Sequence, residues 1–144
     1  MMAIKAIFCS TDMVRKIKTY KKTQDRRLYC NYAVGDNLYV CEQFATHIKD
    51  GESVIYYRAD GELDFIPYWQ QASFMRREQA RIHLFVTRVE KQRLLDITHG
   101  DAIAEGFVNR GEFLNHWDQQ FKIYGLPAAQ NPLVYMIAFD YLPF

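Results

Sequence analysis

The sequence predicts an α+β domain in which five to six strands form a small β-barrel with about three short helices. The chain has 144 residues, of which 49% are apolar and 15% aromatic, which suffices for one packed core. Strand-like and helix-like segments do not alternate regularly, which argues against a parallel sheet with crossover helices. The strand predicted at residues 81–89 is apolar on both faces, as in a curved or closed sheet that is covered from outside. We expect a single domain over residues 1–144.

The first third of the chain predicts a strand, a helix and a second strand. Residues 3–8 resemble a short buried strand, and the polar residues that follow, Ser10 to Asp12, offer an N-cap for a helix. That helix carries Val14 and Ile17 on one face. Residues 21–29 are expected to form a turn or an extended segment, and the turn signal Gly35-Asp36 precedes an apolar strand at residues 38–44.

The middle of the chain predicts two strands separated by a long loop. A strand at residues 54–58 is closed by Asp60-Gly61. In the aromatic-rich loop at residues 63–75 we expect four side chains to cover part of the core, namely Phe65, Tyr68, Trp69 and Phe74. The long strand at residues 81–89 follows, with Ile82, Leu84 and Val86 on its core face and Phe85 and Val89 on the other.

The last third predicts two capped helices and a closing strand. Thr98-x-x-Asp101 resembles a capping box, and the helix after it ends at Gly106, a typical C-cap residue. Asn109-x-x-Glu112 caps a second helix, which ends before Gly125 and Pro127 and presents apolar residues at helical spacing: Phe113, Leu114, Trp117 and Phe121. Residues 133–142 form the closing strand, with alternate residues on one face: Leu133, Tyr135, Ile137 and Phe139.

Positive charge is concentrated in one segment. Seven of the eighteen basic residues lie between Arg15 and Arg27, where Asp25 is the only acid, although the whole chain carries a net charge of +1. The remainder holds eleven basic and sixteen acidic residues, a net charge of −5. A basic patch on an acidic body attracts anions such as nucleic acid or nucleotides, while a solvated helix face is the plainer interpretation.

Several classes of function lack their motifs. The four histidines are scattered without metal-ligand spacing, so we expect no metal and no cofactor. Neither a phosphate-binding glycine loop nor a serine-hydrolase elbow occurs. Cys9, Cys30 and Cys41 are odd in number and show no CxxC spacing, which predicts reduced thiols. No apolar segment is long enough for a signal peptide or a membrane span, and we expect a cytoplasmic protein without membrane contact.

The spacing of Lys22, Asp25 and Arg27 brings a lysine, an acid and an arginine close together in a helix or tight turn. Lysine and arginine together suit a phosphate or carboxylate, since the arginine fork binds an oxyanion through two hydrogen bonds. An exposed Lys22–Asp25 ion pair without functional meaning is the alternative.

Six segments resemble the ASCH domain family of the PUA-like superfamily, in order and spacing, over nearly the whole chain. Residues 20–27, YKKTQDRR, resemble the family's first motif, with Tyr20 where a glycine is usual. Residues 35–42, GDNLYVCE, resemble the strand that follows, and RIHLFVTRV at 81–89 is similar to the long central strand. The remaining matches are LDI at 95–97, DAIAEG at 101–106 and NPLVY at 131–135. The pattern is most similar to ASCH proteins of tailed phages and prophages.

The resemblance implies a cleft where Lys22, Asp25, Arg27 and Glu105 converge, and a protein that binds RNA, a nucleotide or a nucleoside. In members that deacetylate N4-acetylcytidine, the catalytic residues match Lys22, Asp25 and Glu105, with a threonine at the position of Asp25. A carboxylate there is a poor substitute for the hydroxyl nucleophile and raises the lysine's pKa. A nucleic-acid interface would comprise Lys18, Tyr20, Lys21, Lys22, Arg26 and Arg27.

Three hypotheses follow from these residues. The first is a module that binds RNA or a nucleotide through the basic cleft, with Tyr20 and Tyr29 as candidate stacking groups. The second is a hydrolase, acting on a modified nucleoside or on RNA, in which Lys22 and Glu105 direct a water. The third is a phage accessory protein, active in the host cytoplasm, that binds a host or virion protein through its aromatic stretch at residues 65–74.

Overall fold

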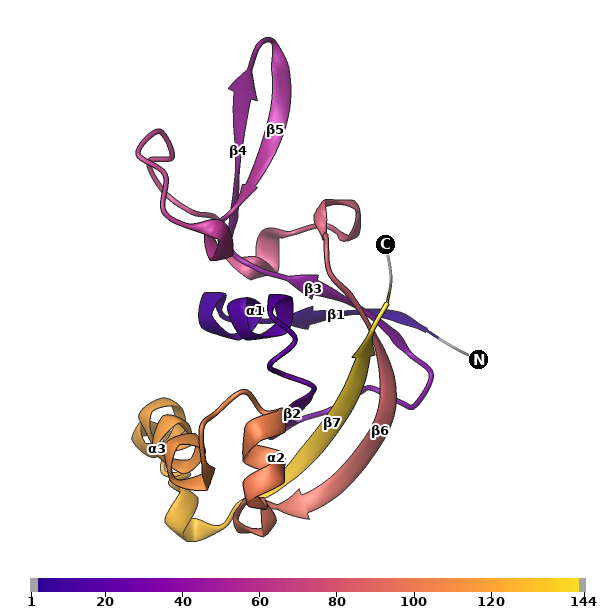
Figure 1. Ribbon diagram of the computed structural model, residues 1–144, viewed down its shortest axis with the longest axis vertical. Helices are drawn as coiled ribbons and strands as arrows, with labels where there is room; N and C mark the ends of the chain where they lie inside the picture. The colour runs from indigo at the N-terminus through magenta and orange to yellow at the C-terminus, as the bar shows by residue number, and fades with distance from the viewer. Residues whose placement is uncertain (1–2, 143–144) are drawn as a thin grey trace.

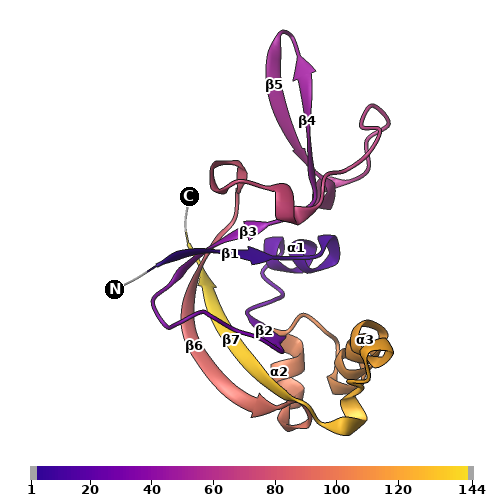
Figure 2. The ribbon, with the colours of Figure 1, turned by 180° about the vertical axis from the view of Figure 1, so that it is seen from behind.

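A strongly curved five-stranded sheet covered on its concave side by three helices forms the body of the protein, as the computed structural model shows for residues 3–142 (Figures 1 and 2). The sheet order is β1-β3-β6-β7-β2, and β4 and β5 form a separate hairpin that projects from the body. None of the helices in residues 3–142 is long and apolar enough to cross a membrane. The elements are β1 (Ile4–Phe8), α1 (Thr11–Lys18), β2 (Gln24–Arg27), β3 (Asn37–Cys41), β4 (Phe44–Lys49), β5 (Glu52–Tyr57), β6 (His83–Arg93), α2 (His99–Ala104), α3 (Arg110–Phe121) and β7 (Leu133–Tyr141).

The α+β prediction is confirmed: residues 3–142 form a five-stranded main sheet with three helices, and β4 and β5 add a two-stranded hairpin. Within the main sheet β1 runs parallel to β3, and the other neighbouring strands are antiparallel. The sheet has edges at β1 and β2. The Arg27 guanidinium of β2 donates a hydrogen bond of 2.8 Å to the carbonyl of Phe8 at the end of β1, so a side chain connects the two edge strands.

Two apolar clusters fix the helices on the sheet. Val14 and Ile17 of α1 are fully buried against residues of the sheet that include Leu84. The second cluster joins Trp117 of α3 to Val134 of β7 and to residues of α2 and the preceding turn. Burial of one such aliphatic side chain stabilises a fold by about 1.5–3 kcal/mol. The amphipathic faces predicted for the first and third helices are thus the faces that pack.

Helices α1 and α2 end in the same backbone arrangement. After α2, the N–H of Gly106 donates to Ile103 and that of Phe107 donates to Ala102, the paired hydrogen bonds of a Schellman motif. After α1, Tyr20 donates to Ile17 and Lys21 donates to Lys16 in the same pattern. The residue at the turn has a positive φ in both, 97° at Gly106 and 59° at Tyr20.

The prediction of one continuous strand at residues 38–44 is wrong for its last three residues. The strand β3 ends at Cys41, and Phe44 begins β4, which the sequence pattern did not separate. Glu42 lies at this break, where it is buried and paired with Arg81 at 3.0 Å. The apolar pattern alone predicted that the strand continues through Glu42, whereas in the structure this residue lies between two strands and forms an ion pair.

Three of the four aromatic residues predicted to cover the core from the 63–75 loop are exposed, while the fourth, Trp69, is half-buried and donates a hydrogen bond to Glu62. The exposed fraction is 47% for Phe65, 73% for Tyr68 and 68% for Phe74. Ile66 and Met75 are the buried members of this segment instead. Phe65 packs against the hairpin, with its ring 5.2 Å from that of Tyr56, so part of the aromatic content supports the projecting hairpin.

The predicted faces of the two longest strands hold over only part of each strand. In β6, Leu84 and Val86 face the core as expected, but a bulge between Val86 and Arg88 turns Val89 towards the same cluster. In β7, Ile137 and Phe139 are buried as expected, whereas Leu133 is 39% exposed. Strand β7 contributes to both apolar clusters, with Val134 in the cluster of α3 and with Ile137 and Phe139 in the cluster of α1.

We predict that Gly106→Ala destabilises the fold by about 1–3 kcal/mol, because a side chain would be strained at this φ. The added Cβ would also lie 2.7 Å from Cδ of Lys16. Gly100→Ala, in α2 with its nearest atom at 3.8 Å, is the matched control and should be neutral or slightly stabilising. Chemical denaturation checks both variants, and equal stability of the two would contradict the prediction.

Candidate functional site

Lys22 is the central residue of the candidate site. Its side chain is buried, and Nζ donates to Oε1 of Glu105 at 2.8 Å and to the backbone carbonyl of Glu105 at 3.1 Å. Oδ1 of Asp25 lies 3.3 Å from the same nitrogen. The three acceptors match the three donors of an ammonium group, so Lys22 is held in one position. The alternative of an exposed Lys22–Asp25 pair is wrong, because both residues are buried.

The turn after α1 and the end of α2 bring Lys22 and Glu105 together. Glu105 is the C-cap residue of α2, directly before the turn at Gly106. The N–H of Thr23 donates to the carbonyl of Ala104 at 2.7 Å, which joins the two segments beside the site. Since α2 is fixed by the predicted capping box at Thr98 and Asp101, local signals along the sequence determine where Glu105 lies.

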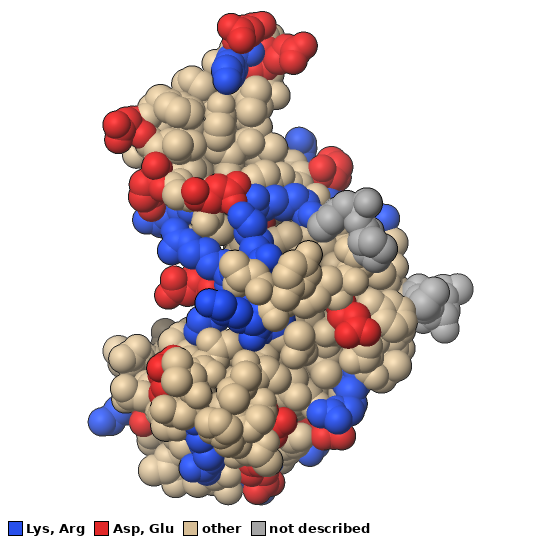
Figure 3. All heavy atoms as spheres, viewed as in Figure 1, with Lys and Arg blue, Asp and Glu red and all other residues tan. Residues whose placement is uncertain are grey.

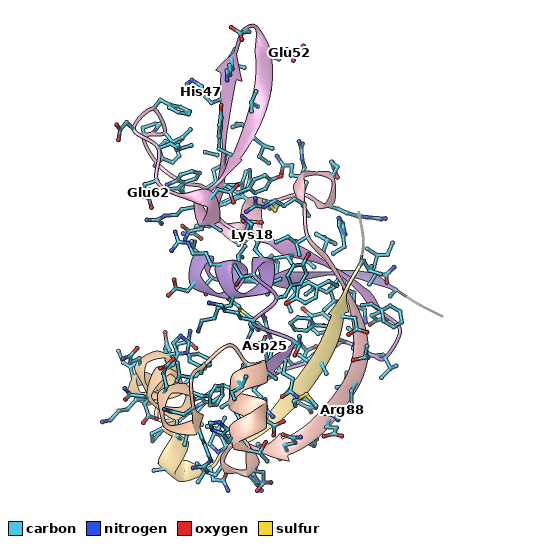
Figure 4. The ribbon with its side chains drawn as sticks, viewed as in Figure 1. Lys18, Asp25, His47, Glu52, Glu62 and Arg88 are labelled. Atoms are coloured by element: carbon cyan, nitrogen blue, oxygen red, sulfur yellow. The ribbon has the colours of Figure 1, made fainter. Side chains whose placement is uncertain are left out.

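Two arginines complete the charge network. Arg26 donates to Oε2 of Glu105 at 3.0 Å, and its side chain is fully buried. Arg27 donates from Nε to Oδ2 of Asp25 at 2.5 Å. Each carboxylate therefore contacts Lys22 and one arginine. Figure 4 shows Asp25 on β2 in the region between α1 and α2, whereas Arg88 of β6 lies on the outside of the sheet.

The network shifts the pKa of its members in different directions. Burial opposes the charge of Lys22, but Glu105 and Asp25 outweigh it and raise the lysine's pKa, as predicted from the carboxylate at position 25. Burial also opposes the charge of Asp25, yet Lys22 and Arg27 hold its pKa below the usual value. Burial raises the pKa of Glu105, to which the charge of Asp25 adds. Glu105 is therefore the member that is best suited to exchange a proton, and Lys22 stays protonated.

A pocket of about 100 Å³ opens above this network. Lys22, Asp25 and Glu105 line its base, together with Arg26, whose Nε is the one buried side-chain N or O atom in residues 3–142 without a hydrogen-bond partner. The walls come from α1, the turn after α2, and α3, and they combine polar and aromatic groups: Ser10, Met13, Lys16, Phe107, Phe113, His116, Trp117 and Gln120.

Lys16 and His116 are pocket residues that the sequence interpretation missed. Nζ of Lys16 lies 3.6 Å above the ring of Phe107, and the ring of His116 lies 5.0 Å from the same ring. Burial and the charge of Lys22 lower the pKa of Lys16. Burial and the charges of Lys16 and Lys22 lower the pKa of His116, which is thus a neutral donor and acceptor at pH 7. The position of His116 three residues after the buried Phe113 was a signal that could have placed it at a wall.

The pocket continues into an outer groove of about 450 Å³. The two share Ser10, Asp12, His116 and Gln120, and the groove adds Arg15 and Arg58 at its outer side. In Figure 3, lysine and arginine side chains form a band across the middle of this face, over α1 and between the hairpin and α3. A polar and aromatic pocket therefore lies beside a groove that carries Arg15 and Arg58. In the same groove, Asp12 lies 3.6 Å from Arg15 and Glu62 lies 2.6 Å from Arg58.

The predicted nucleic-acid residues separate into two groups in space. Lys22, Arg26 and Arg27 join the network, and Arg26 has no exposed side-chain surface. Lys18 lies at the end of α1 and pairs with Asp60, on the side that faces the hairpin (Figure 4). Tyr20 and Lys21 are exposed in the turn between these groups. Their role in binding stays a prediction.

The cysteines are poor candidates for a nucleophile. All three are free thiols. Burial raises the pKa of Cys9 to about 12 and that of Cys41 to about 11, so neither forms a reactive thiolate near neutral pH. Residues 3–142 contain no cluster of His, Cys, Asp or Glu that could hold a metal ion.

We predict that Asp25→Asn destabilises the protein by about 3–5 kcal/mol at pH 7, because it removes a carboxylate from two cations. Because the folded-state pKa of Asp25 lies below the unfolded value, its charge stabilises the fold above about pH 4 and this contribution is lost as the pH falls further. The stability gap between the wild type and Asp25→Asn should narrow between pH 5 and about pH 2.5 in urea unfolding. Asp64→Asn, in an exposed loop, is the control, and a gap independent of pH would refute the assignment.

No family model matches this sequence, and no curated protein matches it. Solved structures do. An ASCH domain from Lactobacillus crispatus matches with a TM-score of 0.58 and 13% identity over 96% of this chain and 79% of that one. A protein of Enterococcus faecalis from the family DUF984 matches with a TM-score of 0.54 and 12% identity, over 99% and 77% of the two chains. The hypothetical protein PH0355 matches with a TM-score of 0.54 and 11% identity, over 98% and 100%.

At these identities the likeness establishes the fold and not a shared activity. It agrees with the ASCH resemblance of the sequence motifs, while the resemblance to phage proteins stays a prediction. The chain has the fold of the ASCH domain.

Proposed function

We propose that this protein binds RNA or a nucleotide, with an unstacked base in the pocket and phosphate at the outer groove. The observation that carries the proposal is the direct continuity of a polar and aromatic pocket with a groove that bears Arg15 and Arg58. The ASCH fold supports it, because the sequence motifs resemble the ASCH family, and that resemblance implies binding of RNA or a nucleotide. We further propose that the chain acts as one domain in the cytoplasm, and that it derives from a tailed phage or prophage.

The chemistry of the pocket suits a nucleobase. Bases are read through hydrogen bonds at their edges and through contact of their faces with aromatic rings. His116 and Gln120 offer both donors and acceptors, and the rings of Phe107 and Trp117 line the same space. The ion network at the base is nearly neutral, because Lys22, Arg26 and Arg27 face Asp25 and Glu105 as well as Asp101, which lies 3.4 Å from Arg26. The phosphate is therefore expected at Arg15 of the outer groove, which is exposed and whose pair with Asp12 is loose, at 3.6 Å.

We predict that binding of a short single-stranded RNA weakens steeply with salt and that Arg15→Gln lowers the slope of log K against log[salt] by about 1, the value for one lost phosphate contact. Fluorescence anisotropy over a range of salt concentrations measures the slope. Lys122→Gln, an exposed charge after α3, is the matched control. A salt-insensitive affinity, or equal slopes for the two variants, would contradict phosphate binding at this groove.

Hydrolysis of a modified nucleoside is the second candidate function. It is favoured by one observation, the 2.8 Å contact between Lys22 and Glu105 at the base of a pocket. Asp25 is bound by Lys22 and Arg27 and has a lowered pKa, so a direct attack by its carboxylate is disfavoured. In the proposed reaction Glu105 takes a proton from a water, the water attacks the amide carbon, and the C–N bond breaks as the amine accepts a proton. The ammonium of Lys22 stabilises the oxyanion.

We predict that, if this second function operates, the protein converts N4-acetylcytidine to cytidine and acetate and Glu105→Gln lowers the rate by at least about 100-fold. Liquid chromatography of cytidine formed over time measures the rate. Glu112→Gln, which changes an exposed glutamate in the first turn of α3, should leave the rate unchanged. Absence of product at high protein concentration, or equal rates for the wild type and a folded Glu105→Gln variant, would exclude the reaction.

Binding of a host or virion protein is a third candidate. The observation that favours it is the exposure of Phe65, Tyr68 and Phe74 beside the projecting hairpin. Exposed aromatic side chains are enriched at protein interfaces. This surface lies on another part of the chain from the pocket residues, so protein binding and nucleotide binding are compatible.

A further inference from the structure

Tyr20 occupies a backbone position that favours glycine. In a Schellman motif the residue after the C-cap adopts the left-handed conformation, where a side chain is strained by its own Cβ. Tyr20 is that residue after α1, with φ 59°, and Gly106 is the same residue after α2, with φ 97°. One protein thus uses glycine at one of these turns and a bulky aromatic residue at the other.

Burial in the core does not explain why a tyrosine occupies position 20. Its exposed fraction is 73%, so little of the ring is removed from water. Its ring centroid lies 4.8 Å from that of Tyr141 in an edge-on arrangement, with the planes at 74°. One edge contact orients the ring, and most of its surface stays accessible. A strained residue that buries little indicates that the side chain serves a purpose other than stability.

The ring stands between two grooves. Tyr20 lines a groove of about 610 Å³ with Tyr141 and Arg81, and also a groove of about 530 Å³ with Lys21 and Phe107. Phe107 in turn lines the pocket above Lys22. The two grooves meet at the ring of Tyr20, and the second groove meets the candidate site at Phe107.

The charges around Tyr20 indicate which class of ligand this surface could bind. Of the seven basic residues between Arg15 and Arg27, Lys22, Arg26 and Arg27 are neutralised in the ion network. Lys18 is engaged by Asp60, whereas Lys21 is exposed directly beside the ring. An aromatic platform flanked by lysine fits a strand that carries both flat bases and phosphates, which is the chemistry of single-stranded nucleic acid. Paired bases in a duplex expose no face to such a ring.

We propose that Tyr20 is a stacking platform for an unpaired base of a single-stranded nucleic acid, whose next phosphate meets Lys21 and whose chain continues across Phe107 towards the pocket. This inference rests on the proposed function and adds the strandedness of the ligand and a second contact point. The turn leaves the ring largely exposed, and the edge contact with Tyr141 orients it.

The test is Tyr20→Gly, which removes both the strain and the ring. Its melting temperature should equal or exceed that of the wild type, while its affinity for a fluorescent octanucleotide should fall about 10-fold, as for loss of one stacked base. Tyr20→Trp should keep the affinity. Tyr124→Ala, which removes an equally exposed tyrosine after α3, should leave it unchanged. Lys21→Gln should lower the salt slope by about 1.

RNA and DNA octamers and a matched duplex distinguish the ligands. Preference for the single strands in the wild type and loss of that preference in Tyr20→Gly support the proposal. If the wild type binds single strands and a folded Tyr20→Gly variant binds them equally well, the platform is refuted and the proposed function survives. If the wild type binds no oligonucleotide at low salt, both are refuted.

Discussion

The buried ammonium group of Lys22 is the contact on which the arrangement of the site depends. It joins the turn after α1 to the end of α2 through Glu105, and to β2 through Asp25, so three segments far apart in the sequence converge on one nitrogen. An ionised lysine is stable inside a protein only when its charge and its donors are matched. The two carboxylates and the backbone carbonyl meet this requirement, and any displacement of α2 would break it. The pocket above has a defined shape because its base cannot shift without exposing an unpaired charge.

The turns that flank this ammonium group follow the same backbone rule with different residues. Helices α1 and α2 each end in a pair of hydrogen bonds that reverses the chain. A member of the network lies directly beside each turn, Lys22 after the first and Glu105 before the second. Glycine at position 106 lets the chain pass close to Lys16, where a Cβ would collide. Tyrosine at position 20 contacts Tyr141 by one edge, and its side chain stays 73% exposed. The local geometry of the two turns is alike, and the surroundings decide which side chain each can hold.

Much of the fold was predictable because it follows from local signals. The N-caps at Ser10, Thr98 and Asn109, the turn at Gly106 and the apolar faces of α1 and α3 are all encoded within a few residues. The hairpin was missed since Phe44 continues an apolar run, although Glu42 breaks the strand by pairing with a residue 39 positions away. The bulge before Arg88 was missed because strict alternation puts Val89 on the face of Phe85, and the register shift shows only in the pairing of β6 with β7. The motifs predicted that Lys22 and Glu105 would meet, but Lys16 and His116 become pocket residues only when α3 packs beside α1.

The separate hairpin offers a site where the chain could accept an insertion. Strands β4 and β5 pair only with each other in the described residues, apart from one bridge between Phe44 and Gln70. Two-stranded hairpins have little stability of their own, so the outer part of this one can open without unfolding the main sheet. Its turn at Asp50 and Gly51, between β4 and β5, lies at the tip, remote from β2 and α2 (Figure 1). A label or an affinity tag inserted between these two residues would report on the molecule while the ion network and its pocket stay intact.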